Sequence, residues 1–205
     1  DLLADKHRAR RSASAEELLG DRRIDAVTVG DGEEIMPAVA DALEGKDVCG
    51  KAKTGSGKTL AFGLPIVQQL ERARTKRPLA VVLVPTRELA QQVTAVLEPL
   101  AAVRGLKTVA VYGGAPMGVQ TKALRRGVEI VIATPGRLID LIERGEVLLE
   151  DVVMAAIDEA DQMADMGFLP QVRRIMSRIP ADHQTFLFSA TLDGQVGTLV
   201  SAYMD

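Results

Sequence analysis

The sequence predicts an α/β domain with a mostly parallel central sheet flanked by helices. Short apolar runs typical of buried strands alternate with amphipathic helical patterns along most of the chain. One loop between a predicted strand and a predicted helix has the composition of a phosphate-binding loop. Polar motifs directly follow the other predicted strands, which is where sheets of this class bind ligands. These observations predict one ligand-binding edge of the sheet.

The predicted elements alternate in a regular order. Apolar side chains at helical spacing predict a helix over 33–43, which Gly45 ends. A second helix is predicted from the phosphate loop to about residue 74, with a kink at Pro65. The predicted strands are 47–50, 79–84, 107–112, 129–133, 152–157 and 184–188. The remaining predicted helices are 87–103, 117–126, 136–144, 169–178 and 194–203.

Length and composition are typical of one soluble globular domain. The chain has 205 residues, of which 47% are hydrophobic and 26% are charged. Cys49 is the single cysteine, so no intrachain disulfide can form and a reducing, cytoplasmic location is expected. The net charge of -3 gives no overall basic signature, so any contact with nucleic acid must use a local group of cations and backbone amides.

The first 31 residues are rich in charge and are predicted to form an N-terminal extension outside the domain, which covers 32–205. Acidic residues flank a basic cluster at 6–11. A solvated tail or short surface helix is therefore favoured over an arm that touches RNA.

The predicted phosphate-binding loop lies between the strand at 47–50 and the helix that follows. Its small residues allow backbone N–H groups to face phosphate oxygens, and the helix N-terminus adds partial positive charge. Lys58 is expected to reach the β- and γ-phosphates, and the Thr59 hydroxyl to bind Mg²⁺. An ordinary turn is the alternative, which the flanking strand and helix disfavour. The loop residues are Ala52, Lys53, Thr54, Gly55, Ser56, Gly57, Lys58 and Thr59, with alanine where the general pattern begins with glycine.

An acidic motif, Asp158-Glu159-Ala160-Asp161, directly follows the strand predicted at 152–157. Asp158 is expected to hold Mg²⁺ through the ion's water shell, opposite Thr59. Glu159 is expected to orient or deprotonate the attacking water. The alternative is that the acidic side chains only cap the next helix.

Six short motifs together resemble the N-terminal RecA-like domain of the DEAD-box ATP-dependent RNA helicases. The acidic motif spells Asp-Glu-Ala-Asp, and the others occur in the order and spacing of that family over 34–205. They are Pro-Thr-Arg-Glu-Leu-Ala at 85–90, Gly-Gly at 113–114, Thr-Pro-Gly-Arg at 134–137, Asp-Met-Gly-Phe at 165–168 and Ser-Ala-Thr at 189–191. The resemblance implies a three-layer P-loop NTPase fold that uses ATP and Mg²⁺, with Lys58, Asp158 and Glu159 as catalytic residues.

The resemblance also implies a surface for the backbone of single-stranded RNA, largely independent of base sequence. The implied RNA-binding residues are Arg87, Gly114, Thr134, Gly136 and Arg137. Ser189, Thr191 and Asp161 are implied to couple the nucleotide and RNA sites. Alternative roles are a helix cap for Thr134 and a turn cap for Ser189.

Two departures from the family pattern bear on function. The glutamine motif that reads adenine in the family is missing at 31–35, so weaker selectivity for ATP is expected. The family's second RecA-like domain does not follow, so the chain alone should bind nucleotide weakly and hydrolyse ATP negligibly. The chain is expected to be a monomer. A truncated, non-catalytic module that binds RNA or a partner is the alternative function; another P-loop ATPase is a remote one.

Five further residues are expected to be structural. Cys49, Met163, Met166 and Phe168 are expected to pack in the core. Tyr112 is expected to pack at its strand end rather than to stack on a base. No metal beyond nucleotide-bound Mg²⁺ is expected.

Overall fold

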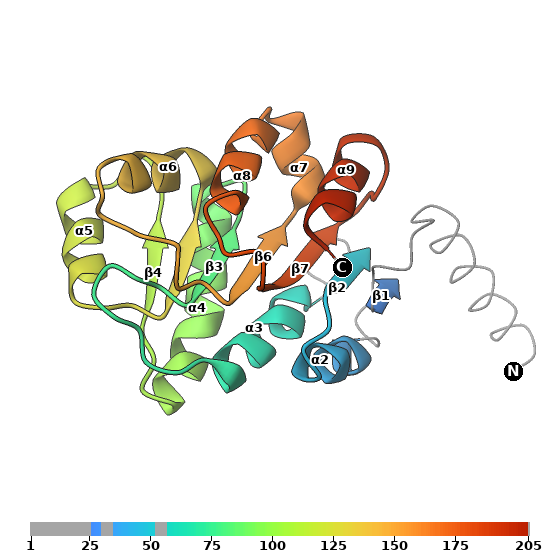
Figure 1. The fold of residues 1–205 in the computed structure, drawn as a ribbon, viewed down its shortest axis with the longest axis horizontal. Helices are drawn as coiled ribbons and strands as arrows, with labels where there is room; N and C mark the ends of the chain where they lie inside the picture. The colour runs from blue at the N-terminus through green and yellow to red at the C-terminus, as the bar shows by residue number, and fades with distance from the viewer. Residues whose placement is uncertain (1–25, 30–34, 52–56, 205) are drawn as a thin grey trace, which may run out of the picture.

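A computed structural model describes residues 26–29, 35–51 and 57–204 of this protein, with side chains described from residue 37 onward. Within these residues, seven parallel strands form one sheet in the order β1-β2-β7-β6-β3-β5-β4 (Figure 1). The strands are, in that order, β1 (Ala26–Val29), β2 (Val48–Lys51), β7 (Gln184–Ser189), β6 (Met154–Asp158), β3 (Ala80–Leu83), β5 (Ile130–Ala133) and β4 (Thr108–Val111). The predicted α/β class with a mostly parallel sheet is confirmed.

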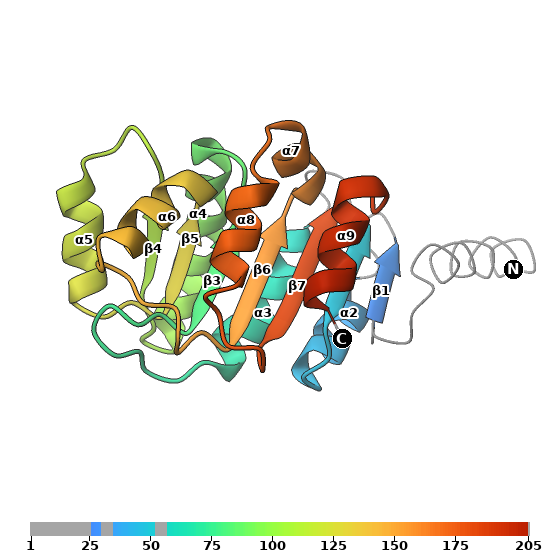
Figure 2. The ribbon, with the colours of Figure 1, turned by 45° about the horizontal axis from the view of Figure 1, so that its top comes forward.

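Helices cover both faces of the sheet. They are α2 (Ile35–Leu43), α3 (Lys58–Gln69), α4 (Arg87–Val103), α5 (Met117–Arg125), α6 (Pro135–Glu143), α7 (Ala160–Asp165), α8 (Leu169–Met176) and α9 (Gly194–Tyr203). Figure 2 shows α6, α8 and α9 in front of the sheet and α3 behind it. No helix of the described residues is long and apolar enough to span a membrane.

The core has two layers because successive side chains of a strand point to opposite faces of the sheet. Val81, Leu83 and Ile157 pack with the helices from α5 to α9. Val82 and Phe186, on the other face, pack with α2, α3 and α4. Burial on both faces explains why these strands are continuous apolar runs in the sequence.

The helix α3 ends at Gln69, so the prediction that it runs to about residue 74 was wrong. Leu70 has extended backbone angles and a side chain that is buried in the core. The Arg104 guanidinium donates to the carbonyl oxygens of Val67 and Gln68 at the end of the helix. A side chain distant in the sequence therefore supplies donors for the last helical carbonyl groups, which local pattern does not reveal.

Residues Ala26–Val29 pair with β2 as strand β1, although the sequence analysis placed them in the N-terminal extension. The run is four residues long and stands in a charge-rich segment, so its β-forming residues made a weak signal. Met166 also differs from expectation, because its side chain is 48% exposed. Met163 is buried, Phe168 packs partly against the core, and the expected core position of Cys49 is confirmed.

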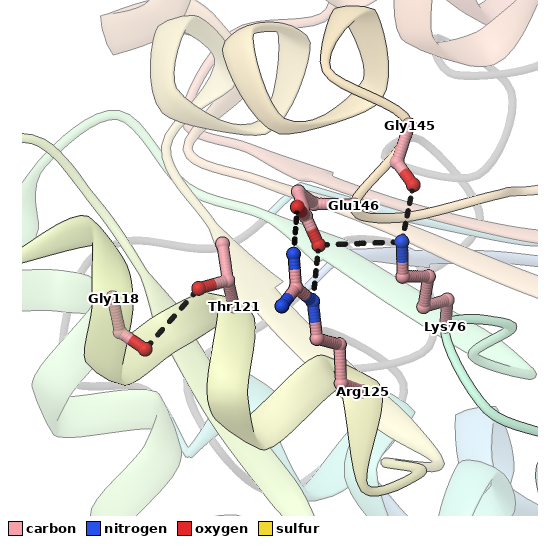
Figure 3. A network of polar contacts seen from close by, with 6 residues as sticks. All are labelled: Lys76, Gly118, Thr121, Arg125, Gly145 and Glu146. Atoms are coloured by element: carbon pink, nitrogen blue, oxygen red, sulfur yellow. Dashed lines mark hydrogen bonds and ion pairs between the residues drawn. The ribbon is translucent and has the colours of Figure 1, made fainter.

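A group of ion pairs secures the loops that lead into the strands (Figure 3). The Arg125 Nε donates to the Glu146 carboxylate over 2.9 Å, and the Lys76 Nζ lies 3.3 Å from the same carboxylate. Lys76 also donates to the Gly145 carbonyl oxygen over 2.9 Å. Because these residues precede β3, β5 and β6, the network stabilises the edge of the sheet opposite the motifs.

Candidate functional site

The predicted motifs converge because the strands are all parallel. Their carboxyl ends meet at one edge of the sheet, and every motif except the one at 165–168, which joins α7 to α8, lies between the end of a strand and the first turns of the next helix. The sheet order places β6 next to β7, and β7 next to β2. The acidic motif, the Ser-Ala-Thr motif and the start of α3 therefore lie side by side.

A buried cluster of opposite charges forms at the centre of this edge. The Lys58 Nζ lies 2.7 Å from the Asp158 Oδ1 and 3.3 Å from the Glu159 Oε1. The Asp158 side chain is 0% exposed and the Lys58 side chain is 6% exposed. Burial raises the pKa of the Asp158 carboxyl above its ordinary value, and the Lys58 ammonium opposes that rise.

The Asp158 carboxylate is incompletely satisfied by the protein. Its Oδ1 lies 2.7 Å from the Lys58 Nζ, and no other side chain of the described residues donates to either oxygen. A buried carboxylate is costly unless cations or hydrogen-bond donors satisfy both of its oxygens, so Mg²⁺ or its water shell would complete a site that Lys58 satisfies in part. Asp158 and Thr59, in the first turn of α3, thus fit the hard oxygen ligands that Mg²⁺ prefers. No group of three potential metal-ligating side chains is found in the described part of the chain.

Glu159 has a left-handed backbone, with φ 56 and ψ 51. This conformation costs a non-glycine residue roughly 1–3 kcal/mol, and such strained residues are enriched at functional sites. Here it turns the chain sharply from β6 into α7. Glu159 is the N-cap residue of α7, but its side chain makes no capping hydrogen bond and contacts Lys58 instead. The alternative that this carboxylate serves as a cap is therefore wrong.

Ser189 supplies the missing cap of α7 from another strand. Its Oγ accepts a hydrogen bond of 3.1 Å from the Asp161 backbone N–H, and its side chain is fully buried. This contact joins two of the three predicted coupling residues. Thr191, the third, is exposed, and no hydrogen bond or ion pair of its side chain is found among the described residues. The alternative considered for Ser189, a cap of the turn after β7, is not found among the described residues, because its hydroxyl caps α7 instead.

Most of the predicted phosphate-binding loop lies outside the described residues, namely Ala52, Lys53, Thr54, Gly55 and Ser56. The segment expected to read adenine, 31–35, has no described side chain, and the basic cluster at 6–11 is also outside the description. Gly57 is described as the N-cap of α3, with φ 79. Glycine adopts this left-handed conformation without the strain that a Cβ would cause.

The predicted RNA-binding residues lie around the loop between β4 and α5. Gly114 has φ 79, and a Cβ added there would lie 3.8 Å from the Arg87 Nη1, so the Arg87 guanidinium lies over this glycine. Arg87 begins α4 and pairs with Glu88 over 3.0 Å. On the other side of the loop, the Arg137 Nη1 donates to the Ala115 carbonyl oxygen over 3.2 Å.

Thr134 and Gly136 lie at the start of α6. Thr134 is the N-cap residue, but its side chain makes no capping hydrogen bond, so the role of side-chain cap considered for it was wrong. Gly136 is exposed, and a Cβ added there would meet no atom within 4 Å. The Thr134 hydroxyl and the open backbone at Gly136 suit close approach by a phosphate.

Sequence reasoning missed Gln120 and the hydroxyl contact of Tyr112. Gln120 lies in α5 with a side chain that is 4% exposed, and it contacts both Arg137 and the Tyr112 carbonyl oxygen. One face of the helix carries Met117, Gln120 and Leu124. A polar residue at a position of this face where an apolar one is expected was the signal that could have revealed Gln120. Tyr112 packs partly against the core as expected, and its hydroxyl accepts a hydrogen bond of 2.8 Å from the Gln91 side chain.

Comparison with known proteins identifies relatives of this chain. A sequence model of the DEAD/DEAH box helicase family matches residues 34–199. The "DEAD-box ATP-dependent RNA helicase 9" of Oryza sativa subsp. japonica is 46% identical over 168 residues, which are 80% of this chain and 26% of that protein. The "Probable ATP-dependent RNA helicase DDX17" of Mus musculus is 47% identical over 167 residues, again 80% of this chain and 26% of the relative.

Solved structures agree with the sequence comparison. The crystal structure of a DEAD box protein from Methanococcus jannaschii superposes with a TM-score of 0.78 at 37% identity, covering 83% of this chain and 46% of that one. A hypothetical ATP-dependent RNA helicase from Sulfolobus tokodaii gives a TM-score of 0.75 at 35% identity, covering 85% of this chain and 50% of that one. The chain thus spans half or less of the length of the relatives it matches. It belongs to the DEAD/DEAH box helicase family.

Proposed function

We propose that this chain is the ATP- and RNA-binding N-terminal core domain of an ATP-dependent RNA helicase. In this proposal, ATP binding and hydrolysis drive local opening of RNA duplexes when a second RecA-like domain joins the first. The observation that carries the proposal is the buried cluster of Lys58, Asp158 and Glu159 at the carboxyl edge of the sheet. Such a cluster suits binding and hydrolysis of a nucleoside triphosphate.

The residues of the cluster have distinct roles in this proposal. Lys58 would bind the terminal phosphates of ATP, and the loop from Ala52 to Thr59 would supply backbone N–H groups to them. Thr59 and, through water, Asp158 would hold Mg²⁺. The bound ion would neutralise charge on the phosphate oxygens. Glu159 orients the attacking water and accepts its proton, which requires Lys58 to leave the carboxylates for the phosphates.

The RNA surface uses the neighbouring loops. Arg87 and Arg137 attract the phosphates, while Gly114, Thr134 and Gly136 allow the RNA backbone to approach closely. These contacts reach no base edge, so binding should be largely independent of sequence. The hydrogen bond between Ser189 and Asp161 ties the Ser-Ala-Thr motif to the acidic motif and supports a coupling role for both residues, with Thr191 beside them.

The proposal is tested by restoring a complete enzyme. The chain is mixed with the second RecA-like domain of the mouse relative and a short single-stranded RNA, and ATP turnover is measured. We expect negligible turnover by the chain alone and RNA-dependent turnover by the mixture, because residues of a second domain complete the transition-state contacts in related NTPases. The second domain is first shown to support turnover with its own natural first domain. Absence of turnover in the mixture would then refute the proposal.

Glu159→Gln tests the catalytic assignment within the same mixture. Loss of a general base should lower turnover by about 10²- to 10⁴-fold while the chain still binds ATP. Glu98→Gln, on the exposed side of α4, is the control and should retain full turnover. Equal turnover by the two variants would contradict the role given to Glu159.

Three further parts of the proposal have independent tests. Weak selectivity for adenine predicts that GTP supports RNA-dependent turnover, and strict dependence on ATP would contradict it. A monomer is expected, and light scattering of the purified chain checks its mass. The single cysteine suits a cytoplasmic location, which imaging of a fluorescently tagged protein tests.

A further inference from the structure

We propose that Gln120 is a positioning residue of the RNA-binding surface. Its buried amide holds the Arg137 guanidinium against the loop between β4 and α5 and so presents the remaining N–H groups of Arg137 to an RNA phosphate. This inference rests on the proposed function, because it assumes that Arg137 binds RNA. Neither the Gly-Gly nor the Thr-Pro-Gly-Arg motif includes Gln120.

The contacts of Gln120 use both ends of its amide. The Gln120 Nε2 donates to the Tyr112 carbonyl oxygen over 3.1 Å, and the Arg137 Nη1 donates to the Gln120 Oε1 over 3.3 Å. A carbonyl oxygen only accepts hydrogen bonds and a guanidinium only donates them. The two neighbours therefore define which end of the amide is oxygen and which is nitrogen.

The position of Gln120 in its helix supports a specific role. Its side chain is 4% exposed and lies on the face of α5 that carries Leu124 into the core. Burying an amide is unfavourable unless it is hydrogen-bonded, and an apolar side chain would fit this face without that cost. The contacts to Tyr112 and Arg137 compensate for the burial and distinguish this position from an ordinary core position.

Two acceptors orient the Arg137 guanidinium. Its Nη1 donates to the Gln120 Oε1 and to the Ala115 carbonyl oxygen, which together use both N–H groups of that nitrogen. The Nη2 and Nε groups have no acceptor among the described residues, and no ion pair of Arg137 is found there. The guanidinium thus keeps its full charge and three N–H donors for an external anion. A planar guanidinium that is already oriented loses less entropy when it binds phosphate.

The same contacts reach the helix that carries the other predicted RNA-binding arginine. The Tyr112 carbonyl oxygen accepts from Gln120, and the Tyr112 hydroxyl accepts from the Gln91 Nε2 over 2.8 Å. Gln91 lies one turn after Arg87 in α4. Tyr112 therefore links α5 to α4, and Gln120 links α5 to α6. The chain of contacts thus joins α6, which carries Arg137, through α5 to α4, which carries Arg87.

The test measures affinity of the chain for a fluorescein-labelled, single-stranded RNA of twelve nucleotides by fluorescence anisotropy, over a series of KCl concentrations. Gln120→Met keeps the length and approximate volume of the side chain but removes both hydrogen bonds. We expect it to weaken RNA binding about three- to tenfold, as loss of one or two hydrogen bonds would. The slope of log affinity against log salt should fall by up to about 0.7, the value for one phosphate contact with a single strand.

A double-mutant cycle distinguishes positioning from a general structural effect. Because Gln120 acts through Arg137, Gln120→Met should cause no further loss in an Arg137→Ala background. Arg137→Lys keeps the charge but lacks the planar fork, so it should weaken binding by a similar factor to Gln120→Met. This last variant tests the importance of orientation even if substitution of Gln120 prevents folding.

Gln184→Leu is the matched control for loss of a buried amide. Gln184 also donates to backbone carbonyl oxygens, including that of Ala42 over 2.8 Å, but it begins β7 at the opposite edge of the sheet. Its substitution should lower thermal stability and leave both the affinity for RNA and the salt slope unchanged.

Three outcomes would overturn the inference and leave the proposed RNA-binding role of Arg137 intact. One is Gln120→Met binding RNA within twofold of the unaltered chain while Arg137→Ala binds weakly. Another is a loss from Gln120→Met that persists in full in the Arg137→Ala background. Arg137→Lys binding as tightly as the unaltered chain would also contradict it, because charge alone would then suffice. If Arg137→Ala itself leaves binding unchanged, the RNA-binding role proposed for Arg137 is wrong, and this inference is wrong with it.

Discussion

The Ser-Ala-Thr motif offers a sharp test of the structure, because its two hydroxyl residues have different environments. Ser189 is fully buried, and its Oγ accepts the Asp161 backbone N–H over 3.1 Å. Thr191 is exposed and has no hydrogen bond within the described residues. Family resemblance implies the same coupling role for both residues. The structure instead predicts that Ser189→Ala destabilises the fold and Thr191→Ala does not.

The magnitude follows from the position of the lost hydrogen bond. Asp161 lies in the first turn of α7, where backbone N–H groups have no partner inside the helix. The Glu159 side chain, which stands at the N-cap, contacts Lys58 and does not cap the helix. Removing the Ser189 Oγ therefore leaves a partly buried N–H without an acceptor, which costs about 1–2 kcal/mol. For a chain of this size the melting temperature should fall by about 2–8 °C.

The assay is urea denaturation followed by circular dichroism, with thermal melting as a second measurement. Ser189→Ala should lower the urea midpoint without changing the slope m, because the surface exposed on unfolding is the same. Thr191→Ala should remain within about 0.5 kcal/mol of the unaltered chain, as is usual for exposed positions. Equal stability losses for the two variants would refute the hydrogen bond between Ser189 and α7 as the cause.

Three other predictions concern residues away from the motifs. Glu129 is buried, and its carboxylate accepts hydrogen bonds from the backbone N–H groups of Ala73 and Lys107. Glu129→Ala should therefore lower the free energy of unfolding, measured by urea denaturation, by about 3–5 kcal/mol. Glu98→Ala, at an exposed position, is the control and should have almost no effect. Hydrogen bonding from Arg125 lowers the pKa of the Glu146 carboxyl. The Glu146 carboxylate therefore stabilises the folded chain above the unfolded pKa of about 4.3, and this stabilisation is lost as the pH falls through the lower pKa of the folded state. Glu146→Gln should reduce the loss of stability in this acidic range, measured by urea denaturation at a series of pH values. A Glu146→Gln variant that loses stability with acid as much as the unaltered chain would contradict the role given to this carboxylate. Burial raises the pKa of the Cys49 thiol to about 12, so a thiol reagent at pH 8 should label the chain only after unfolding, and rapid labelling of the native chain would exclude this environment.

Much of the fold was predictable because its local signals agree with its packing. The helix over 87–103 has the predicted bounds, since Thr86 caps its start and its apolar face meets the sheet. The buried strands were predictable as apolar runs for the same reason. The end of α3 could not be predicted, because Arg104, which donates hydrogen bonds to its last carbonyl groups, lies after β3 and α4 in the sequence. Strand β1 was missed because four β-forming residues give a weak signal beside charged neighbours.

Several predicted site residues lie together in the structure, through contacts that the sequence did not indicate. The sequence predicted one site for phosphate and Mg²⁺ that contains Lys58, Asp158 and Glu159. The structure brings these three side chains together. The sequence did not indicate that Lys58 would pair directly with both carboxylates. Gln120 was missed because a glutamine in an amphipathic helix is usually assigned to the exposed face.

The sequence by itself determined which chemical groups are present and at which edge of the sheet they gather. That much follows from motif order and parallel topology, because the carboxyl ends of parallel strands share one edge. Only the tertiary structure decided which groups touch. The Lys58 and Glu159 side chains meet across 101 residues, and Asp161 and Ser189 across 28. Such contacts depend on strand order, helix packing and the left-handed turn at Glu159, which no local pattern of residues specifies.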